Sequence, residues 1–388
     1  MARRTIFSSE SVTRGHPDKI CDQIADGILD AFLDQDPGAE VAAECAVSTG
    51  LVFLAVNSVA NVSADVTRIA RDVIRDIGYS AQSGFDPDTC SVVTSVSHRT
   101  PDRRRGSEPP THQASLFGYA CLDTPERMPL PIVLAHGLAR QLDHARQKGK
   151  VPYLAPDGKT LVAVEFEDHQ PTRIHTVIVS VQHSPALDRP SRLEADIRDT
   201  VLPAVFDHAP IGLDRRTKVL INPGGAFLVG GPRRDAGLTG RKNVVDTYGG
   251  FARQGGGALS GKDPDHVDRF GAYAARYMAR NVVAAGLASR CEVHLSYGVG
   301  EEHPLAVTAE TFGTGDDEQI ERALARLIDL RPNAIVDRFG LRALTGHHGG
   351  EFYRRLAAYG HFGRTDLDIP WEREDLVGAL GGAARRAG

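Results

Sequence analysis

The chain has 388 residues, of which 41% are hydrophobic and 24% are charged. This balance is typical of a globular protein with about two or three domains, and it excludes a disordered or fibrous chain. The formal net charge of -5 excludes the overall positive charge of a nucleic-acid-binding protein, so any anion must be bound by a local group of cations.

The five cysteines are scattered and form no C-x-x-C pair, which argues against a zinc site or a disulfide framework. The sequence contains no run of about 18 apolar residues and no apolar leader at its start. We therefore expect reduced cysteines and a cytoplasmic protein that contacts neither membrane nor nucleic acid.

Helical and strand-like patterns alternate along the chain. Alternating or β-branched runs predict strands over residues 41–47, 51–56, 91–96, 173–181, 218–221 and 293–297. Apolar residues repeating on one helical face predict helices over residues 20–32, 66–77 and 193–201. Sheets covered by helices, and hence an α+β fold, are expected.

Two segments interrupt this order. Residues 101–110 are charged and rich in proline, which predicts a mobile surface loop that serves as a linker or lid. Residues 230–263 are rich in glycine and carry Arg241, Lys242 and Lys262 between the glycines. Such a concentration of cations is unusual for a connector.

The motif GHPDK at residues 15–19 stands directly before the first predicted helix, where free backbone N–H groups and the helix dipole favour an anion. His16 adds a hydrogen-bonding group, Asp18 a metal ligand and Lys19 a cation. Asp18 could equally be a simple helix cap. The motif alone therefore does not assign a function.

The glycine-rich segment contains two groups of residues suited to phosphates. Glycines in residues 235–242 allow close approach of the backbone to a ligand before the cations Arg241 and Lys242. Residues 256–262 nearly match the P-loop pattern, but Asp263 replaces its Ser/Thr and no buried strand precedes it, which argues against a P-loop NTPase. Together with Asp268 on the following helix, the two groups predict a polyphosphate and metal site.

Two further positions are ambiguous by themselves. Residues 157–159 (Asp-Gly-Lys) are predicted to form a turn between strands with solvated charges. Glu44 lies within an apolar strand, where an unpaired carboxylate is costly, so it predicts either a salt bridge or a bound cation.

In combination, these motifs resemble those of S-adenosylmethionine synthetases. The resemblance runs in the same order to about residue 371 and is carried by residues 8–20, 237–242, 245–250, 255–263 and 358–363. It implies three interleaved α/β domains related by pseudo-threefold symmetry, and dimers or tetramers with active sites built from two subunits. The expected divisions are an N-terminal domain over 1–100, a shortened lid loop over 101–114, a central domain over 115–230, a C-terminal domain over 231–372 and a tail over 373–388.

The resemblance also implies an adenosyl transfer. A nucleophile attacks C5′ of ATP and displaces triphosphate, which is then cleaved to phosphate and diphosphate, with Mg²⁺ and K⁺ as cofactors. The residues that match catalytic positions are His16, Lys159, Arg241, Lys242 and Lys262. Further ATP contacts match Asp157, Phe227, Asp235 and Ala258, the magnesium ligands match Asp18 and Asp268, and the potassium ligand matches Glu44.

The chain departs from the family pattern mainly around the amino-acid substrate. Asn57 stands where the family has the glutamate that binds the methionine ammonium, Arg99 replaces a glutamine, His266 a lysine and His112 the lid aspartate. Ala226 also replaces an arginine near the nucleotide. The nucleophile pocket is predicted to contain Asn57, Arg99, His112, Gln113, Asp235, His266 and Val299.

These changes remove negative charge and add positive charge, so we predict a small anionic nucleophile that lacks an ammonium. Three alternatives remain open: a conventional methionine adenosyltransferase, a regulatory homologue that only binds ATP, and a hydrolase that uses water to release triphosphate.

Overall fold

The computed structural model describes residues 3–100, 112–187 and 189–387, and its chain is arranged in three sheets with helices. The first sheet has the order β4-β3-β2-β9, and the helices α1 and α2 lie against each other, with α1 packed on β2. The bounds are α1 (Pro17–Leu33), β2 (Glu40–Ser48), β3 (Leu51–Val59), α2 (Val66–Ile77), β4 (Ser91–Arg99) and β9 (Gly237–Leu238).

The second sheet has the order β1-β6-β7-β8 and is covered by α3, with α4 and α5 beside it. The third has the order β11-β10-β5 and is covered by α7 and α8. The second group comprises β1 (Arg4–Val12), α3 (Leu130–Gln147), β6 (Leu154–Glu167), β7 (Gln170–His183), α4 (Pro190–Thr200), α5 (Leu202–Phe206) and β8 (Lys218–Ile221). The third comprises β5 (Ala114–Cys121), α7 (Val267–Ala284), β10 (Arg290–Tyr297), β11 (Ala306–Glu310) and α8 (Asp317–Leu327).

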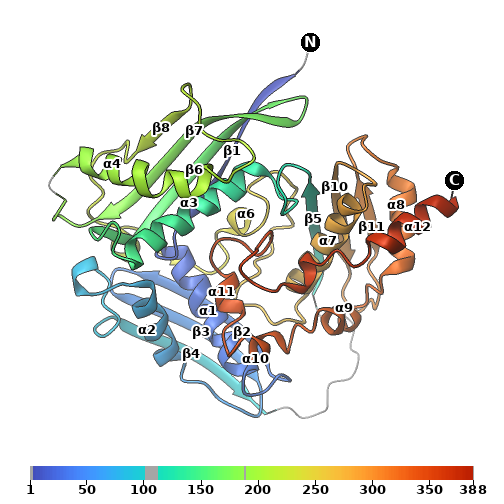
Figure 1. The fold of residues 1–388 in the computed structure, drawn as a ribbon. Helices are drawn as coiled ribbons and strands as arrows, with labels where there is room; N and C mark the ends of the chain where they lie inside the picture. Colours follow the sequence, from blue (N-terminus) through green and yellow to red (C-terminus); the bar gives the residue numbers. More distant parts are fainter. Residues whose placement is uncertain (1–2, 101–111, 188, 388) are drawn as a thin grey trace.

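The three units exchange strands. The N-terminal strand β1 joins the second sheet, β5 joins the third, and β9 returns from the glycine-rich segment to the first (Figure 1). Near the centre of the view, α11 packs on α1. The remaining helices are α6 (Asn243–Asp246), α9 (Pro332–Phe339), α10 (Leu344–His347), α11 (Tyr353–Leu356) and α12 (Val377–Ala387). The predicted α+β class and the interleaving of three units are therefore confirmed.

The predicted elements are all found, because each had a clear apolar period. Strand β8 and helix α2 have the predicted bounds, and the other strands extend by one to three residues at one or both ends. The predicted loop over residues 101–110 lies outside the described residues. All five cysteines are buried and free, as expected. Within the described residues, no helix combines the length and apolar character needed to cross a bilayer.

One local prediction was wrong. Asp157 and Lys159 lie inside β6 and not in a turn, because the strand continues through a register irregularity between Leu154 and Gly158. Glu44 lies on the outward face of β2, and its pairing with a cation or a salt-bridge partner stays a prediction. Only the alternate residues of β2, such as Val41 and Val47, face the core.

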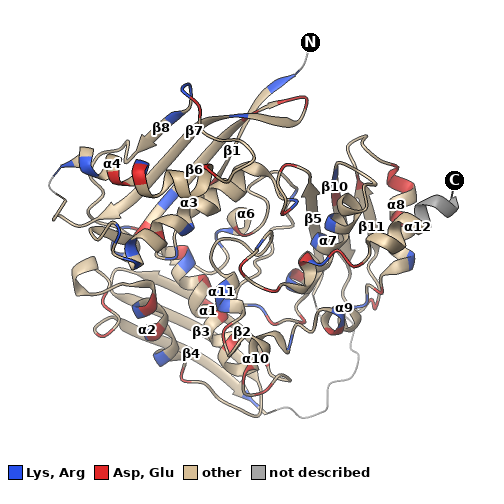
Figure 2. Ribbon diagram, viewed as in Figure 1, with Lys and Arg blue, Asp and Glu red and all other residues tan. Residues whose placement is uncertain are grey.

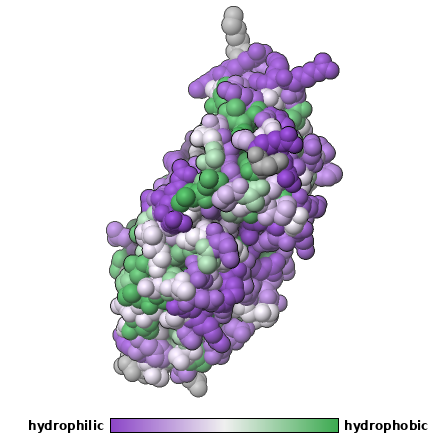
Figure 3. Space-filling model, turned by 90° about the vertical axis from the view of Figure 1, so that its left-hand side faces the viewer, coloured by the Kyte–Doolittle hydropathy of each residue, from purple (hydrophilic) through white to green (hydrophobic). Residues whose placement is uncertain are grey.

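Among the residues that the structure describes, one face of the first sheet is open. Side chains alternate between the α1 side and this open side, where Leu51, Phe53 and Val93 are exposed. In the edge-on view of Figure 3, apolar surface gathers mainly along one edge of the molecule, between hydrophilic regions. A sheet with one bare apolar face is typical of a protein that associates through it.

Candidate active site

His16 occupies the start of α1 and is almost fully buried, with 3% of its surface exposed. It, and not Asp18, is the N-cap: its Nδ1 accepts a hydrogen bond from the Asp18 backbone N–H at 3.2 Å. Burial, and secondly the charge of Lys242, lower the His16 pKa to about 3. The ring is therefore neutral near pH 7, and because Nδ1 is an acceptor, Nε2 carries the proton and can donate to a ligand.

The cations of the first phosphate-binding group gather at the same helix end. Lys242 Nζ lies 2.7 Å from Asp18 Oδ2, and Arg241 lies 3.9 Å from Asp18 Oδ1. This approach requires Gly237, because a Cβ there would lie 2.2 Å from the backbone of Pro17. The predicted association of His16, Asp18, Arg241 and Lys242 is thus present in the fold.

A cavity of about 400 Å³ lies beside this helix end. Its wall contains five residues predicted to contact the nucleotide: His16, Asp157, Lys159, Phe227 and Asp235. Asp157 is buried, which raises its pKa to about 6, and its Oδ2 accepts a hydrogen bond from Gly231 N at 2.8 Å. Its Oδ1 is buried without a partner among the described residues, which leaves an acceptor for an N–H or O–H group of a ligand.

The cavity also contains Arg234, which the sequence analysis did not single out. Its guanidinium lies over the Phe227 ring, 4.6 Å from the ring centroid. Ala226 lines the same cavity, so Arg234 brings a cation to the place where the expected arginine is missing. In the sequence, Arg234 could have been noted as a cation three residues after the pair Gly230-Gly231. Its contact with Phe227 in the cavity is seen only in the structure.

We expect the Arg234→Ala variant to raise the KM for ATP by roughly tenfold, because a charge-assisted contact and a cation–π contact contribute together about 1–3 kcal/mol. Its kcat should change less than its KM. The neighbouring Arg233→Ala variant is the matched control, since Arg233 does not line the cavity. Steady-state kinetics with varied ATP measure the KM and the kcat of each variant. Equal KM values for Arg234→Ala and Arg233→Ala would contradict a contact between Arg234 and ATP.

The second phosphate-binding group lies at the start of α7 and repeats the arrangement at α1. His266 is the N-cap, its Nδ1 accepts from Asp268 N at 3.2 Å, and Asp268 is ion-paired with Lys262. Burial, and secondly the Lys262 charge, lower the pKa of His266 to about 4, so this ring is also neutral near pH 7. The change from lysine to His266 therefore produces a second His-x-Asp cap.

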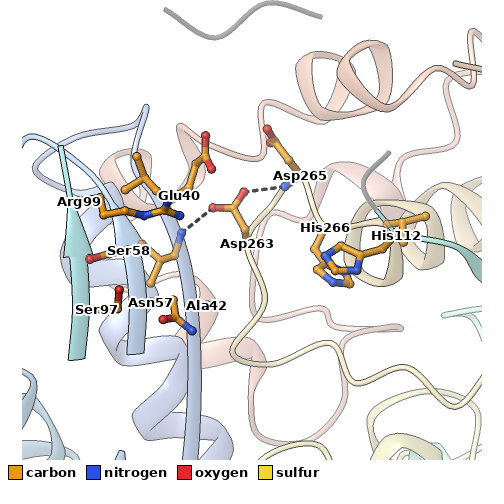
Figure 4. A pocket seen from close by; sticks show the side chains of 13 residues that line it. Glu40, Ala42, Asn57, Ser58, Ser97, Arg99, His112, Asp263, Asp265 and His266 are labelled. Atoms are coloured by element: carbon orange, nitrogen blue, oxygen red, sulfur yellow. Dashed lines mark hydrogen bonds between the residues drawn. The ribbon is translucent and has the colours of Figure 1, made fainter. Parts of the chain in front are cut away.

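A second cavity of about 400 Å³ contains four of the positions at which the sequence departs from the family pattern (Figure 4). Asn57 and Arg99 belong to the open face of the first sheet, and His112 stacks on His266 with ring centroids 4.6 Å apart. The structure thus brings together side chains from β3, β4, the end of the lid and the start of α7. This grouping is the one that the family resemblance implies.

The same cavity contains carboxylates that the sequence analysis missed. Glu40 lies in the same cross-strand row as Arg99, with Val59 between them. Asp263 accepts a hydrogen bond from Val41 N at 2.9 Å and is ion-paired with Arg342, as is Asp265. The wall is therefore mixed in charge, and Glu40 is a possible counter-ion for an ammonium near Asn57.

Three other predicted pocket residues are not in this wall. Asp235 lines the nucleotide cavity, Gln113 is exposed before β5, and Val299 is 60% exposed and lines neither cavity. Ala258 is partly buried, and a Cβ on Gly240 would lie 2.4 Å from the Ala258 Cβ, so it packs beside the Arg241 turn. Within one chain, the nucleotide side and the nucleophile side are two separate cavities.

The carboxylates fit magnesium that arrives with phosphates. Among the described residues, no group of three or more His, Cys, Asp or Glu could enclose a metal ion. Asp18 and Asp268 are each ion-paired with a lysine that is predicted to bind phosphate, and Mg²⁺ usually takes one or two carboxylates together with phosphate oxygens and water. Glu44 on the outward face of β2 would offer a carboxylate ligand to K⁺, with the Lys262 charge nearby.

Comparisons with known proteins identify the family of the chain. The models of the N-terminal, central and C-terminal domains of S-adenosylmethionine synthetase match residues 4–101, 108–227 and 229–373. The chain belongs to the S-adenosylmethionine synthetase family. It is 49% identical to the S-adenosylmethionine synthase of Synechococcus sp. (strain JA-2-3B'a(2-13)), with 97% of each chain covered. It is 48% and 46% identical to those of Thermosynechococcus vestitus and Picosynechococcus sp., with 98% of each chain covered.

Proposed function

We propose that this chain is an ATP-dependent adenosyltransferase whose nucleophile is the sulfur of methionine, so that it makes S-adenosylmethionine. The sulfur forms a bond to C5′ of ATP while the C5′–O bond breaks, and triphosphate leaves with the bonding electrons. The observation that carries this proposal is the position of neutral His16, in one cavity with Lys159 and beside Lys242. The names of relatives at 46–49% identity support methionine as the substrate.

The residues of the first cavity suit the departure of a highly charged group. A thioether sulfur is neutral and needs no general base, so the chief requirement is stabilisation of charge on the leaving oxygens. The Nε2–H of His16 can donate to the oxygen that leaves C5′, and Lys159, Arg241 and Lys242 supply positive charge. Magnesium bound through Asp18 and Asp268 would neutralise further phosphate charge.

Self-association supplies a reason for the two separate cavities. The nucleotide cavity and the cavity at Asn57 each contain only part of the expected substrate contacts. The open sheet face with Phe53 and Val93 is apolar and exposed, and Asn57 and Arg99 lie on that same face. We propose that a twofold dimer forms through this face and joins the first cavity of one subunit to the second cavity of its partner.

A second candidate nucleophile is a thioether or thiol acid without an ammonium. The observation that favours it is the grouping of Asn57, Arg99, His112 and His266 in one cavity. Relative to the family pattern, a glutamate and an aspartate are lost at Asn57 and His112, and Arg99 adds a cation in place of a glutamine. Glu40 in the same wall favours methionine, because it could pair with the ammonium. The two candidates therefore differ in which charged side chain meets the substrate.

The test of adenosyl transfer is the identity of the products. Incubation with ATP, Mg²⁺, K⁺ and either L-methionine or 3-(methylthio)propanoate should give an adenosylated sulfonium compound by mass spectrometry, together with phosphate and diphosphate. ADP or AMP as the first nucleotide product would contradict attack at C5′. Adenosine with no adduct would identify the hydrolase alternative, and ATP binding without any product would identify the regulatory one.

A further inference from the structure

Helix α1 carries a row of four buried carboxylates, of which the proposed chemistry uses only the first, Asp18. Asp18, Asp22, Asp26 and Asp30 recur at four-residue spacing on one face, and none is more than 2% exposed. We call these four residues the aspartate row. The apolar stripe that begins at Ile20 occupies the opposite face. Carboxylates are almost never fully buried unless they are paired, so each member must have partners.

Each member accepts a hydrogen bond from the backbone of a segment more than 200 residues away. Asp18 binds Leu238 N at 3.1 Å, Asp22 binds Gly240 N at 2.8 Å, and Asp26 binds Gly261 N at 2.9 Å. Asp30 binds Tyr353 N at 3.1 Å and Arg354 N at 2.9 Å. The acidic residues of α1 are visible along the helix in Figure 2.

Two of these bonds end directly beside the phosphate-binding cations. Gly240 precedes Arg241 and Lys242, and Gly261 precedes Lys262. Both glycines have a positive φ, +76° for Gly240 and +81° for Gly261. Glycine adopts positive φ about as readily as negative φ, so the residue type alone does not fix this conformation. The local sequence therefore leaves the direction of these turns open, and an outside contact is needed to fix it.

Asp26 makes a second contact with the same effect. Its Oδ1 accepts a bond from the Arg269 guanidinium at 2.5 Å, and Arg269 directly follows Asp268 on α7. Asp26 therefore binds Gly261, which precedes Lys262, and Arg269, which follows Asp268, and so contacts both sides of the Lys262–Asp268 ion pair. Both Asp26 and Arg269 are fully buried, which keeps this contact free of competition from water.

We propose that Asp22 and Asp26 are positioning residues, which hold Arg241, Lys242 and Lys262 in place for the triphosphate of ATP. The proposal rests on the proposed function, because it assigns the role of the cations to leaving-group stabilisation. Preorganised charges stabilise a transition state without reorganisation, and a displacement of about 1 Å can cost roughly 100-fold in rate. The row thus links the first unit of the fold to the rate of the chemical step.

Asp30 provides a matched control within the same row. It is equally buried, belongs to the same face and accepts the same kind of backbone hydrogen bonds. Its partners, Thr345, Tyr353 and Arg354, lie in the C-terminal segment, and none of them is next in sequence to Arg241, Lys242 or Lys262. A purely structural role for the row predicts the same effects from Asp22 and Asp30 variants.

The experiment compares Asp22→Ala, Asp22→Asn and Asp30→Ala by kcat per folded enzyme and by thermal unfolding. Asp22→Ala removes the acceptor for Gly240 N, while Lys19 keeps its second partner, Asp246. We expect its kcat to fall about 100-fold, with a smaller change in the KM for ATP. Asp22→Asn should recover most of the loss because its amide oxygen still accepts from Gly240 N. Asp30→Ala should lower the Tm and leave kcat per folded enzyme unchanged.

If Asp22→Ala does not fold, the Asp22→Glu variant is used in its place. This variant keeps the charge, but its side chain is longer by one methylene and displaces Gly240. A large loss of kcat is again expected. Calorimetric binding of inorganic tripolyphosphate with Mg²⁺ separates the two proposals without a nucleophile. Wild-type enzyme that does not bind it would overturn the proposed function and the positioning role together. Wild-type binding, with equal kcat losses in the Asp22 and Asp30 variants or none in either, would overturn the positioning role alone.

Discussion

The Lys262→Ala variant is expected to lose about two to three orders of magnitude in kcat, with the Tm nearly unchanged. Lys262 is a partly exposed cation in the second phosphate-binding group, ion-paired with Asp268 and preceded by Gly261, which Asp26 holds. Its charge would act on the leaving triphosphate, and removing one such group from a preorganised site typically costs about 3–4 kcal/mol of barrier. Initial rates of adenosyl product formation at saturating ATP measure the effect.

Lys150→Ala is the control for a general effect of lost charge. Lys150 is exposed in the turn after α3 and belongs to neither group of predicted phosphate cations, so this variant should keep normal kcat. Because the Lys262 loss comes from the transition state, kcat and kcat/KM should fall together. A Lys262→Ala enzyme with a raised KM and normal kcat would instead show that the lysine only binds ATP.

The Asn57→Glu variant is expected to raise kcat/KM for L-methionine by roughly ten- to a hundredfold over the wild type. A carboxylate at this position, on the open sheet face in the cavity with Arg99 and His266, would face the ammonium. A charge-assisted hydrogen bond of this kind contributes about 1.5–3 kcal/mol. For 3-(methylthio)propanoate, the kcat/KM of the same variant should not exceed that of the wild type, because that acid has no ammonium for the new carboxylate to bind. Parallel kinetics with the two thioethers measure the difference.

Glu40→Gln and Arg99→Gln separate the two candidate nucleophiles. If Glu40 holds the methionine ammonium, Glu40→Gln should lower kcat/KM for methionine and leave kcat/KM for the acid without an ammonium unchanged. If the natural nucleophile is an acid without an ammonium, Arg99→Gln should lower kcat/KM for the acid and leave methionine less affected. Wild-type turnover of methionine at ordinary efficiency, with no reaction of the acid, would refute the anion prediction that the sequence analysis made.

The sequence by itself determined the elements and the family. The periodic apolar residues of α2 and the short strand β8 specify their bounds, because side-chain burial on one face is a local property of the chain. The motif at residues 15–19 predicted the start of a helix whose first backbone N–H groups are free to bind an anion, and α1 does begin within this motif, at Pro17. The glycine-rich motifs predicted the cations for a phosphate chain through their residue types and order. The grouping of Asn57, Arg99, His112 and His266 followed from the family resemblance.

Only the tertiary structure decided which face or partner each polar group received. Glu44 was predicted to need a partner, and strand β2 turns it to the open face. Arg234 reaches Phe227 only through the fold of the second unit, and Glu40 reaches the row of Arg99 only through strand pairing. The acceptors Asp22 and Asp26 lie 218 and 235 residues from their glycine donors. Their spacing on a buried helix implies that partners exist, but a local pattern contains no information about which distant backbone N–H groups will supply them, because that depends on how separate units pack.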